Sequence, residues 1–301
     1  RRSGSEAGRL EVLDYRKAFR VKPGQQLRLN KIDPAYASKH ESEEAAKEET
    51  ERYLKKLAHQ QALLYAENKH SVLVVLQAMD AGGKDGTIKH VFGPVNPQGV
   101  RVARFNQPTA VESAHDFLWR VHPHAPGKGE IAIFNRSHYE GVLVERVHKL
   151  VNRRTWTERY RHIRDFEALL AENNTAILKF FLHISRQEQL ARFAQRLDDP
   201  TRNWKISEAD YTERAFWDAY TEAYEDAIAA TSTGEAPWYV IPSDHKWFRN
   251  LAVSQILADT MADLALAFPP PPVNLAVIRR KYHAAVRQAQ SDGKKPGGKK
   301  A

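Results

Sequence analysis

Residues 71–90, SVLVVLQAMDAGGKDGTIKH, decide how the rest of the chain folds. The stretch opens with the uninterrupted apolar run Val72–Leu76, which is rich in β-branched residues. A short run of this kind that stops at glycine predicts a central parallel strand buried on both faces. The segment 80–86 then brings glycines and a lysine, and a helical pattern follows it. Strand, glycine turn, lysine and helix together predict a loop that binds phosphate.

This loop departs from the usual phosphate-loop pattern G-x-x-x-x-G-K-[ST] at two positions. Gly83 and Lys84 fit, but Ala78 stands where the first glycine belongs and Asp85 stands where Ser or Thr belongs. The usual loop uses that hydroxyl on magnesium, so metal binding must be arranged differently here. A plain strand-to-helix turn that needs glycine for its backbone is the alternative, and the flanking strand and helix favour the phosphate site.

The composition limits the class of protein. The chain has 301 residues, 42% of them hydrophobic, which allows one large α/β domain or two small ones. It has no cysteine, which excludes disulfides, thiolate nucleophiles and thiolate metal ligands. No apolar run is long enough to span a bilayer, and the N-terminus lacks the core of a signal peptide. We therefore expect a cytoplasmic protein without a membrane partner.

The net charge of +9 is concentrated near the C-terminus. Residues 275–301 hold eight Lys or Arg and one Asp, which gives +7 there and leaves only about +2 for the rest. A nearly neutral body without a known reader motif argues against nucleic acid as a partner. A nucleic-acid-binding protein that uses its basic tail is kept as the third alternative.

Predicted strands and helices alternate along the chain. After the first strand, further strands are predicted at 100–105, 130–134, 175–184 and 238–242. Helices are predicted at 42–68, 86–92, 109–121, 155–172, from 185 to about 200, 208–230 and 245–267. Capping boxes begin the helices at 109, 155 and 185. This alternation predicts a doubly wound sheet of five parallel strands with helices on both faces.

We expect three parts along the chain. Residues 1–40 form an irregular N-terminal segment, residues 41–268 form the catalytic domain, and residues 269–301 form a tail. Four consecutive prolines begin the tail, which continues as a short basic helix and ends in the disordered sequence GKKPGGKKA.

Polar clusters follow three of the predicted strands. The first strand leads into Asp80–Lys84, the strand 130–134 leads into Asn135–Glu140, and the strand 175–184 leads to an arginine-rich segment. Ligands of such sheets bind at the carboxyl ends of the strands. Three polar clusters at one edge of the sheet therefore predict the active site there.

The residue types in these clusters suit phosphoryl transfer, which needs charge neutralisation, positioning and a metal. Lys84 is expected to reach phosphate oxygens, and Arg136 to hold a phosphate with two N–H groups, with a structural salt bridge as the alternative for Arg136. Asp80 is expected to hold Mg²⁺, or Mn²⁺ as an alternative, and Asp85 and Glu140 are further metal candidates.

The segment 192–205, RFAQRLDDPTRNWK, places cations beside a proline and predicts a lid that folds over bound phosphates. Arg192 and Arg196 are spaced to share one helix face. A solvated helix with ordinary surface charges is an equally weighted alternative. Trp204 and the aromatic residues of 211–224 are assigned to the core. The histidines show no metal-ligand spacing, and no G-x-S-x-G nucleophile motif occurs.

Three motifs in this order resemble the polyphosphate kinase 2 family: LQAMDAGGKDGTIKHVFGPVNPQGVRV (76–102), GEIAIFNRSHYE (129–140) and RLDDPTRNWKIS (196–207). The resemblance covers about residues 30–265. It implies a P-loop kinase fold related to thymidylate kinases, a three-layer α/β sandwich with a helical lid at about 185–210. It also implies transfer of a terminal phosphate between inorganic polyphosphate and AMP, ADP or ATP with Mg²⁺. We expect a homo-oligomer.

Carried over position by position, the resemblance matches Asp80 and Lys84 to the Walker A aspartate and lysine and Arg136 to the Walker B arginine. Lid residues that contact polyphosphate in the family match Arg196, Arg202 and Lys205. The candidate catalytic residues are Asp80, Lys84, Arg136 and Glu140, of which Asp80 and Glu140 are the metal candidates. The candidate phosphate-binding residues are Gly82, Gly83, Lys84, Asp85, Gly86, Lys89, Arg136, Arg196, Arg202 and Lys205.

One departure from the family pattern is informative. Many members have Asp-Arg-Ser at the Walker B site and Asn further along, whereas this chain has Asn135-Arg136-Ser137 and Glu140. The exchange keeps one carboxylate but moves it, and it resembles the class III branch, whose members phosphorylate both AMP and ADP. A role as direct metal ligand is therefore less favoured for Asn135 and more favoured for Glu140. An ATP-dependent nucleoside monophosphate kinase on the same fold is the second alternative, and the lid cations and Asp85 favour polyphosphate.

Overall fold

The computed structural model describes residues 13–292. Residues 1–12 and 293–301 lie outside it, and with them lie part of the predicted irregular N-terminal segment and the predicted disordered end of the tail. The chain divides into two units between Ala267 and Phe268. The second unit contains helix α11 (Leu275–Asp292).

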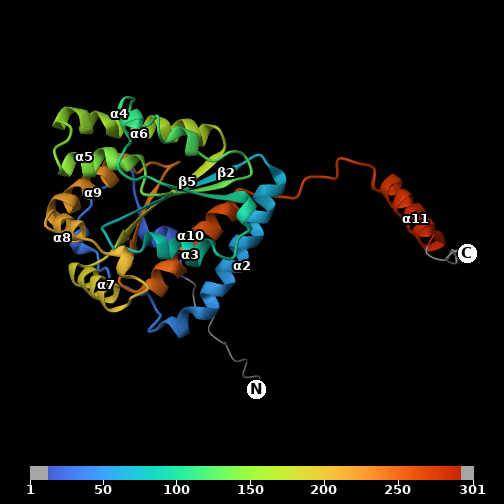
Figure 1. The fold of residues 1–301 in the computed structure, drawn as a ribbon, viewed down its shortest axis with the longest axis horizontal. Helices are drawn as coiled ribbons and strands as arrows, with labels where there is room; N and C mark the ends of the chain where they lie inside the picture. The colour runs from blue at the N-terminus through green and yellow to red at the C-terminus, as the bar shows by residue number, and fades with distance from the viewer. Residues whose placement is uncertain (1–12, 293–301) are drawn as a thin grey trace, which may run out of the picture. The chain divides into compact units, whose positions relative to one another are not determined.

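A mixed α/β arrangement around a six-stranded sheet forms the first unit (Figure 1). The strand order is β1-β6-β5-β2-β4-β3. The bounds are β1 (Arg20–Val21), β2 (Ser71–Ala78), β3 (Val100–Arg104), β4 (Ile131–Asn135), β5 (Thr175–His183) and β6 (Trp238–Pro242). Strands β2 to β6 are mutually parallel, and β1 pairs antiparallel with β6. The predicted number of five strands is therefore wrong, because β1 adds a sixth that is too short to show a pattern in the sequence.

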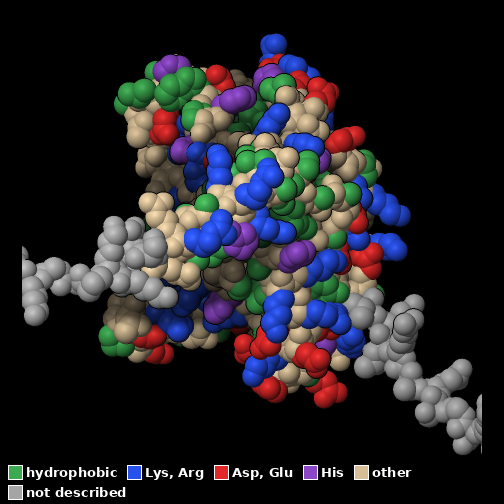
Figure 2. All heavy atoms as spheres, turned by 90° about the vertical axis from the view of Figure 1, so that its right-hand side faces the viewer, with side chains coloured by type: hydrophobic (Ala, Val, Ile, Leu, Met, Phe, Trp, Pro, Cys, Tyr) green, Lys and Arg blue, Asp and Glu red, His purple; other side chains and the backbone are tan. Residues whose placement is uncertain are grey.

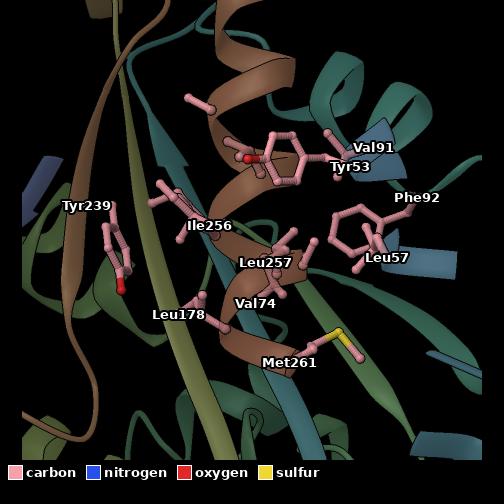
Figure 3. Packing of buried hydrophobic residues seen from close by; sticks show 14 of the residues in the cluster. Tyr53, Leu57, Val74, Val91, Phe92, Leu178, Tyr239, Ile256, Leu257 and Met261 are labelled. Atoms are coloured by element: carbon pink, nitrogen blue, oxygen red, sulfur yellow. The ribbon is translucent and has the colours of Figure 1, made fainter. Parts of the chain in front are cut away.

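Helices cover both faces of the sheet (Figure 1). Helices α2 (Glu43–Glu67), α3 (Lys84–Phe92) and α10 (Lys246–Asp263) cover one face, where Leu57 and Ile256 are buried with Val74 of β2 (Figure 3). Helices α6 (Arg153–Glu172) and α9 (Trp217–Thr231) contribute to a second core with Val75 of β2. Every residue of β2 is buried, because alternate side chains enter the two cores. This is the double burial that the apolar run predicts.

The described part of the segment predicted to be irregular contains three short elements. These are α1 (Tyr15–Phe19), β1 and the 3-10 turn η1 (Leu29–Lys31). Tyr15 is buried, and its amide N–H donates to Gln255 Oε1 of α10 at 2.7 Å. The segment is fixed by contacts with residues far along the chain, so its own sequence shows no periodicity.

The predicted end of one helix and the predicted start of another are wrong. The capping box at Thr109 forms, but α4 (Ala110–Ser113) ends after one turn. Asp116 Oδ1 accepts N–H groups two and three residues later and so begins a new turn. Helix α6 begins before the predicted box, because Asn152 Oδ1 accepts the N–H of Thr155 at 2.9 Å.

The later helices also differ in part from the prediction. Helix α7 (Arg186–Asp198) begins as predicted, with Ser185 as its N-cap. The predicted helix 208–230 is divided into α8 (Glu208–Arg214) and α9, because the intervening N–H groups bond three residues back and tighten the turn. Helix α10 ends short of residue 267, before Ala265 adopts a left-handed φ of 52°.

No helix among residues 13–292 is both long and apolar enough to cross a membrane. On the face that Figure 2 shows, Lys and Arg side chains lie among Asp and Glu side chains.

Candidate active site

The glycine loop, residues 79–86, joins the carboxyl end of β2 to the start of α3. Gly83 has a φ of 102°, which side chains rarely allow, and a Cβ on it would collide with Nη1 of Arg249. A Cβ on Gly82 would collide with Ala78. Gly83 is thus required by its backbone conformation, and Gly82 by its close approach to Ala78. The first free N–H groups of α3 and its partial positive charge lie at the loop.

Two non-glycine residues of the site have left-handed backbones. Ala81 in the loop has a φ of 59°, and Arg136 after β4 has a φ of 60°. Such conformations cost about 1–3 kcal/mol each and persist only where the surrounding structure fixes them. The loop and the end of β4 are therefore held in defined positions.

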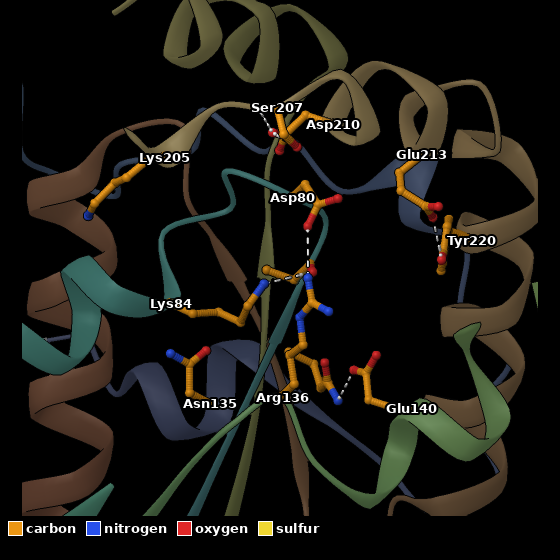
Figure 4. A network of polar contacts seen from close by, with 12 residues as sticks. Asp80, Lys84, Asn135, Arg136, Glu140, Lys205, Ser207, Asp210, Glu213 and Tyr220 are labelled. Carbon is orange, nitrogen blue, oxygen red and sulfur yellow. Dashed lines mark hydrogen bonds and ion pairs between the residues drawn. The ribbon is translucent and has the colours of Figure 1, made fainter. Parts of the chain in front are cut away.

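Lys84, Arg136 and Asp80 lie together at the centre of the site (Figure 4). Lys84 Nζ donates to the Ala78 carbonyl at 3.2 Å, and Arg136 Nη2 donates to Asp80 Oδ1 at 3.2 Å. Burial lowers the pKa of Lys84 to about 8, and the charge of Arg136 lowers it as well. Within residues 13–292, no carboxylate forms an ion pair with Lys84. An anion placed here would remove the cost of burying this ammonium group.

The unusual pair Asn135 and Glu140 lies on two sides of Arg136 (Figure 4). Asn135 Nδ2 donates to Asp85 Oδ1 at 2.7 Å, which ties the end of β4 to the start of α3. Glu140, in the 3-10 turn η4 (His138–Val142), accepts a hydrogen bond from Gln77 Nε2 at 3.2 Å. Burial raises the pKa of Glu140, while Arg136 and Lys84 lower it. The Glu140 carboxylate thus lies near Arg136 and Lys84, whereas the Asp85 carboxylate accepts a hydrogen bond from Asn135.

A cavity of about 920 Å³, the loop cavity, opens over the glycine loop. Its lining contains Asp80 and every predicted phosphate-binding residue, namely Gly82, Gly83, Lys84, Asp85, Gly86, Lys89, Arg136, Arg196, Arg202 and Lys205. The sequence clusters that were expected at one edge of the sheet therefore share one cavity. Glu140 does not line this cavity.

The predicted lid is formed by α7, the 3-10 turn η5 (Asn203–Lys205) and the start of α8. Arg196 Nη1 donates to the Lys205 carbonyl at 2.9 Å, and Asn203 Nδ2 donates to the Arg196 carbonyl at 2.7 Å. Lys205 Nζ lies 4.0 Å from Asp85 Oδ2. The lid thus has an internal polar framework and touches the glycine loop.

Trp204 is 76% exposed, so its assignment to the core is wrong. Its Nε1 donates to the Thr201 carbonyl at 3.0 Å, and Lys205 Nζ lies 5.0 Å from the centre of its ring. These contacts hold the turn η5 of the predicted lid, in which the Trp204 ring faces solvent. Among the aromatic residues of 211–224, Tyr224 is buried as predicted, whereas Tyr211 and Phe216 are exposed.

A second cavity of about 670 Å³ shares Arg136 and Asn106 with the first. Glu140 lines this cavity. Its other lining residues combine apolar and polar side chains and include Phe105, Asn106, Phe117, Arg120, Val121 and Arg159. Mixed linings of this kind suit a small organic ligand with a few polar groups, and Arg136 stands between the two cavities.

The carboxylates of the site can hold a metal only together with a ligand. Among the described residues, no group of three or more His, Asp or Glu could bind a metal ion by itself. Burial lowers the pKa of Arg136, whereas the carboxylates of Glu140 and Asp80 raise it. Two carboxylates therefore lie near the Arg136 guanidinium. Mg²⁺ is commonly held by one or two carboxylates plus substrate phosphates, and this donor set fits that pattern.

The residues that line the site or bond within it and that sequence reasoning missed include Gln77, Arg104, Lys246 and Arg249. Gln77 lies at the end of an apolar strand, where it positions Glu140. Arg249 lies on α10 among apolar residues, and both its neighbour Phe248 and the guanidinium itself are buried. A charged residue inside an otherwise apolar helix is the signal that would have found it.

Comparison with known proteins gives one consistent result. Residues 39–268 match the profile described as polyphosphate kinase 2. An AMP/ADP-polyphosphate phosphotransferase of Meiothermus ruber is 55% identical over 85% of this chain and 96% of that protein. An ADP-polyphosphate phosphotransferase of Rhodopseudomonas palustris is 45% identical over 90% of this chain and 97% of that protein.

A solved structure agrees with these sequence matches. The crystal structure of polyphosphate kinase 2 from Arthrobacter aurescens superposes with a TM-score of 0.87 at 38% identity, over 91% of this chain and 98% of that one. The fold and the sequence motifs thus agree with a match over most of the chain. The chain belongs to the polyphosphate kinase 2 family.

Proposed function

We propose that the protein transfers the terminal phosphate of inorganic polyphosphate to AMP and to ADP. The observation that carries this proposal is the pair of cavities joined at Arg136. Ten Lys or Arg side chains line the loop cavity against six Asp or Glu side chains. This excess of positive charge suits a polyanion without a base or sugar. The second cavity, which we name the acceptor cavity, has the mixed lining that a nucleotide needs. The names of the relatives from Meiothermus ruber and Rhodopseudomonas palustris support both substrates.

The residues act by positioning and charge neutralisation, as on other P-loop kinase-like folds. A phosphate oxygen of AMP or ADP attacks the terminal phosphorus of the donor, and the bond to the shortened polyphosphate breaks. The attacking oxygen is already an anion near neutral pH, so no general base is required. Lys84 and the N–H groups of the loop stabilise the donor phosphates, and Arg136 bridges donor and acceptor.

The carboxylates have a separate task. Asp80, together with the substrate phosphates, would hold Mg²⁺, which neutralises part of the phosphate charge. Asp80 also fixes Arg136 through their hydrogen bond at 3.2 Å. Glu140 lies on the acceptor side of Arg136 and supports the acceptance of AMP, which is one phosphate shorter than ADP. Because AMP and ADP are cytoplasmic metabolites, we place the reaction in the cytoplasm.

A light-emitting ATP assay tests the proposal. Polyphosphate plus ADP is expected to give ATP directly, and polyphosphate plus AMP is expected to give ADP and then ATP. Chelation of Mg²⁺ is expected to stop both reactions. The control reaction contains ATP and AMP and no polyphosphate. Rapid ADP formation in this control, together with no activity in the polyphosphate reactions, would establish an ATP-dependent nucleoside monophosphate kinase instead.

A further inference from the structure

Arg249 is a buried cation without an anionic partner. Its side chain lies on α10 in the wall of the loop cavity, and the residue is only 2% exposed. Its Nη2 and Nε atoms donate to Asn250 Oδ1 at 2.8 and 3.2 Å. Within residues 13–292, no carboxylate forms an ion pair with it. A buried guanidinium normally has a carboxylate or several carbonyl partners, because burial without them costs several kcal/mol.

Its neighbour Arg192 shows what a satisfied arginine looks like in the same place. Arg192 donates to Glu188 Oε1 at 2.7 Å and to the Ala81 carbonyl at 2.9 Å. The two guanidinium groups repel each other, and burial together with Arg192 lowers the pKa of Arg249 to about 9. Among the described residues, Arg192 thus has a carboxylate and backbone carbonyls as partners, whereas Arg249 has only the side-chain amide oxygen of Asn250.

The position of Arg249 indicates what it is open to. Its Nη1 lies against Gly83, and its Nη2 lies 3.1 Å from where a Cβ on Gly86 would be. Helix α10 packs against α3, so the guanidinium faces the first turn of α3 and its free N–H groups. Lys246, three residues earlier on α10, also lines the loop cavity.

We propose that Arg249 binds a phosphate of the donor chain other than the one transferred, on the α10 side of the glycine loop. Lys84 and Arg136 then serve the transferred phosphate, and Arg249 with Lys246 holds the chain behind it. This inference rests on the proposed polyphosphate substrate. It extends the donor site to α10.

The variant Arg249→Met removes the charge and keeps an apolar side chain. Its melting temperature distinguishes a structural role of Arg249 from a ligand-binding role. An arginine that holds the fold together would lower the melting temperature when replaced. An unpaired buried charge has the reverse effect, and its replacement by an apolar side chain is expected to keep or raise the melting temperature of the free protein. Arg192→Met is the matched control, because it breaks a paired buried arginine and is expected to lower the melting temperature.

Tripolyphosphate without an acceptor is the probe for binding. We expect Arg249→Met to weaken its binding by about 10- to 100-fold, the effect of losing a hydrogen bond to a charged group. The rise in melting temperature that tripolyphosphate causes in the wild type should shrink accordingly. In turnover, the KM for polyphosphate should rise while the KM for ADP stays the same. If Arg249→Met does not fold, Arg249→Gln is measured in the same way.

Unchanged tripolyphosphate affinity in a folded Arg249 variant would overturn the inference. So would a melting temperature that falls as far as in Arg192→Met with no change in the KM for polyphosphate. Wild-type protein is assayed in parallel with polyphosphate and ADP. Failure of that wild-type reaction counts against the proposed function, whereas a normal wild-type reaction with unaffected Arg249 variants counts against this inference alone.

Discussion

Two buried lysines, one in the core and one at the glycine loop, differ in how they are paired. Lys179 of β5 is fully buried, and its Nζ donates to Glu167 Oε2 at 2.6 Å, to the Thr231 carbonyl at 2.7 Å and to Tyr139 Oη at 3.0 Å. Within residues 13–292, the one acceptor for Lys84 Nζ is the Ala78 carbonyl. Burial lowers the pKa of both and nearby carboxylates raise it, but among the described residues only Lys179 donates a hydrogen bond to a carboxylate. We call a buried charge saturated when protein groups, including a carboxylate, accept its hydrogen bonds, and unsaturated when they do not. A saturated charge stabilises the fold, whereas an unsaturated one is suited to bind a ligand.

The saturated network also supports the site. Glu167 bridges Lys179 and His138, whose Nε2 lies 3.1 Å from Glu167 Oε1. His138 and Tyr139 belong to η4, the turn that also carries Glu140. The network therefore fixes the backbone of η4 and, with it, the position of Glu140.

The largest effect is expected at the saturated lysine. Lys179→Met should reduce the free energy of unfolding by about 3–5 kcal/mol, because Glu167 is left buried without its partner. Urea denaturation measures this change. The double variant Lys179→Met/Glu167→Gln should recover part of the loss, and a single variant as stable as the wild type would show that the pair contributes nothing to the fold.

The second effect concerns the unsaturated lysine. Lys84→Ala should lower kcat/KM by about 10³-fold, because phosphate oxygens lose a preorganised positive charge. Its melting temperature should stay near that of the wild type, since no carboxylate loses a partner. Turnover within a few-fold of the wild type would eliminate the glycine loop as the donor site.

Proton uptake gives an independent measure of Lys84. The free protein has a Lys84 pKa of about 8, so at pH 8.5 this side chain is partly neutral. A bound polyanion raises the pKa, and the lysine then takes up a proton. Calorimetry with tripolyphosphate in buffers of different ionisation enthalpy should show uptake in the wild type and less in Lys84→Ala. Equal uptake in both proteins would assign the proton to another group.

The third effect tests the acceptor side. Glu140→Asn should reduce AMP phosphorylation by about 30- to 1000-fold, the effect of losing a metal contact worth roughly 2–4 kcal/mol, and should affect ADP phosphorylation far less. The measurement is kcat/KM for both acceptors with polyphosphate and Mg²⁺ fixed. Glu145→Gln is the control, because Glu145 lines the same cavity but pairs with Arg159 at 2.6 Å. Equal losses for AMP and ADP would make Glu140 a general catalytic group, and no loss would make it structural.

The sequence predicts best what is encoded locally. The apolar run before the loop, the glycines and Lys84 are adjacent, so their pattern already contains the strand, the turn and the helix start. Arg249 and Gln77 escaped because their roles depend on neighbours far along the chain. Trp204 was misassigned because apolar character alone does not tell whether a turn packs against anything. The start of α6 was missed because Asn152 caps the helix three residues earlier, through the N–H of Thr155.

The smallest effect is expected from the basic tail. Its cations Arg279, Arg280, Lys281 and Arg287 are exposed, so they carry no desolvation cost that a ligand would relieve. The buried core of the first unit ends by Leu266, before the proline run. A chain ending at Pro272 should therefore keep its turnover at saturating polyphosphate and ADP within about two-fold. The assay compares both lengths at equal protein concentration, with the melting temperature as the check on folding. If the shortened protein is folded but inactive, exposed tail cations take part in the site, and burial is not what separates binding charges from the others.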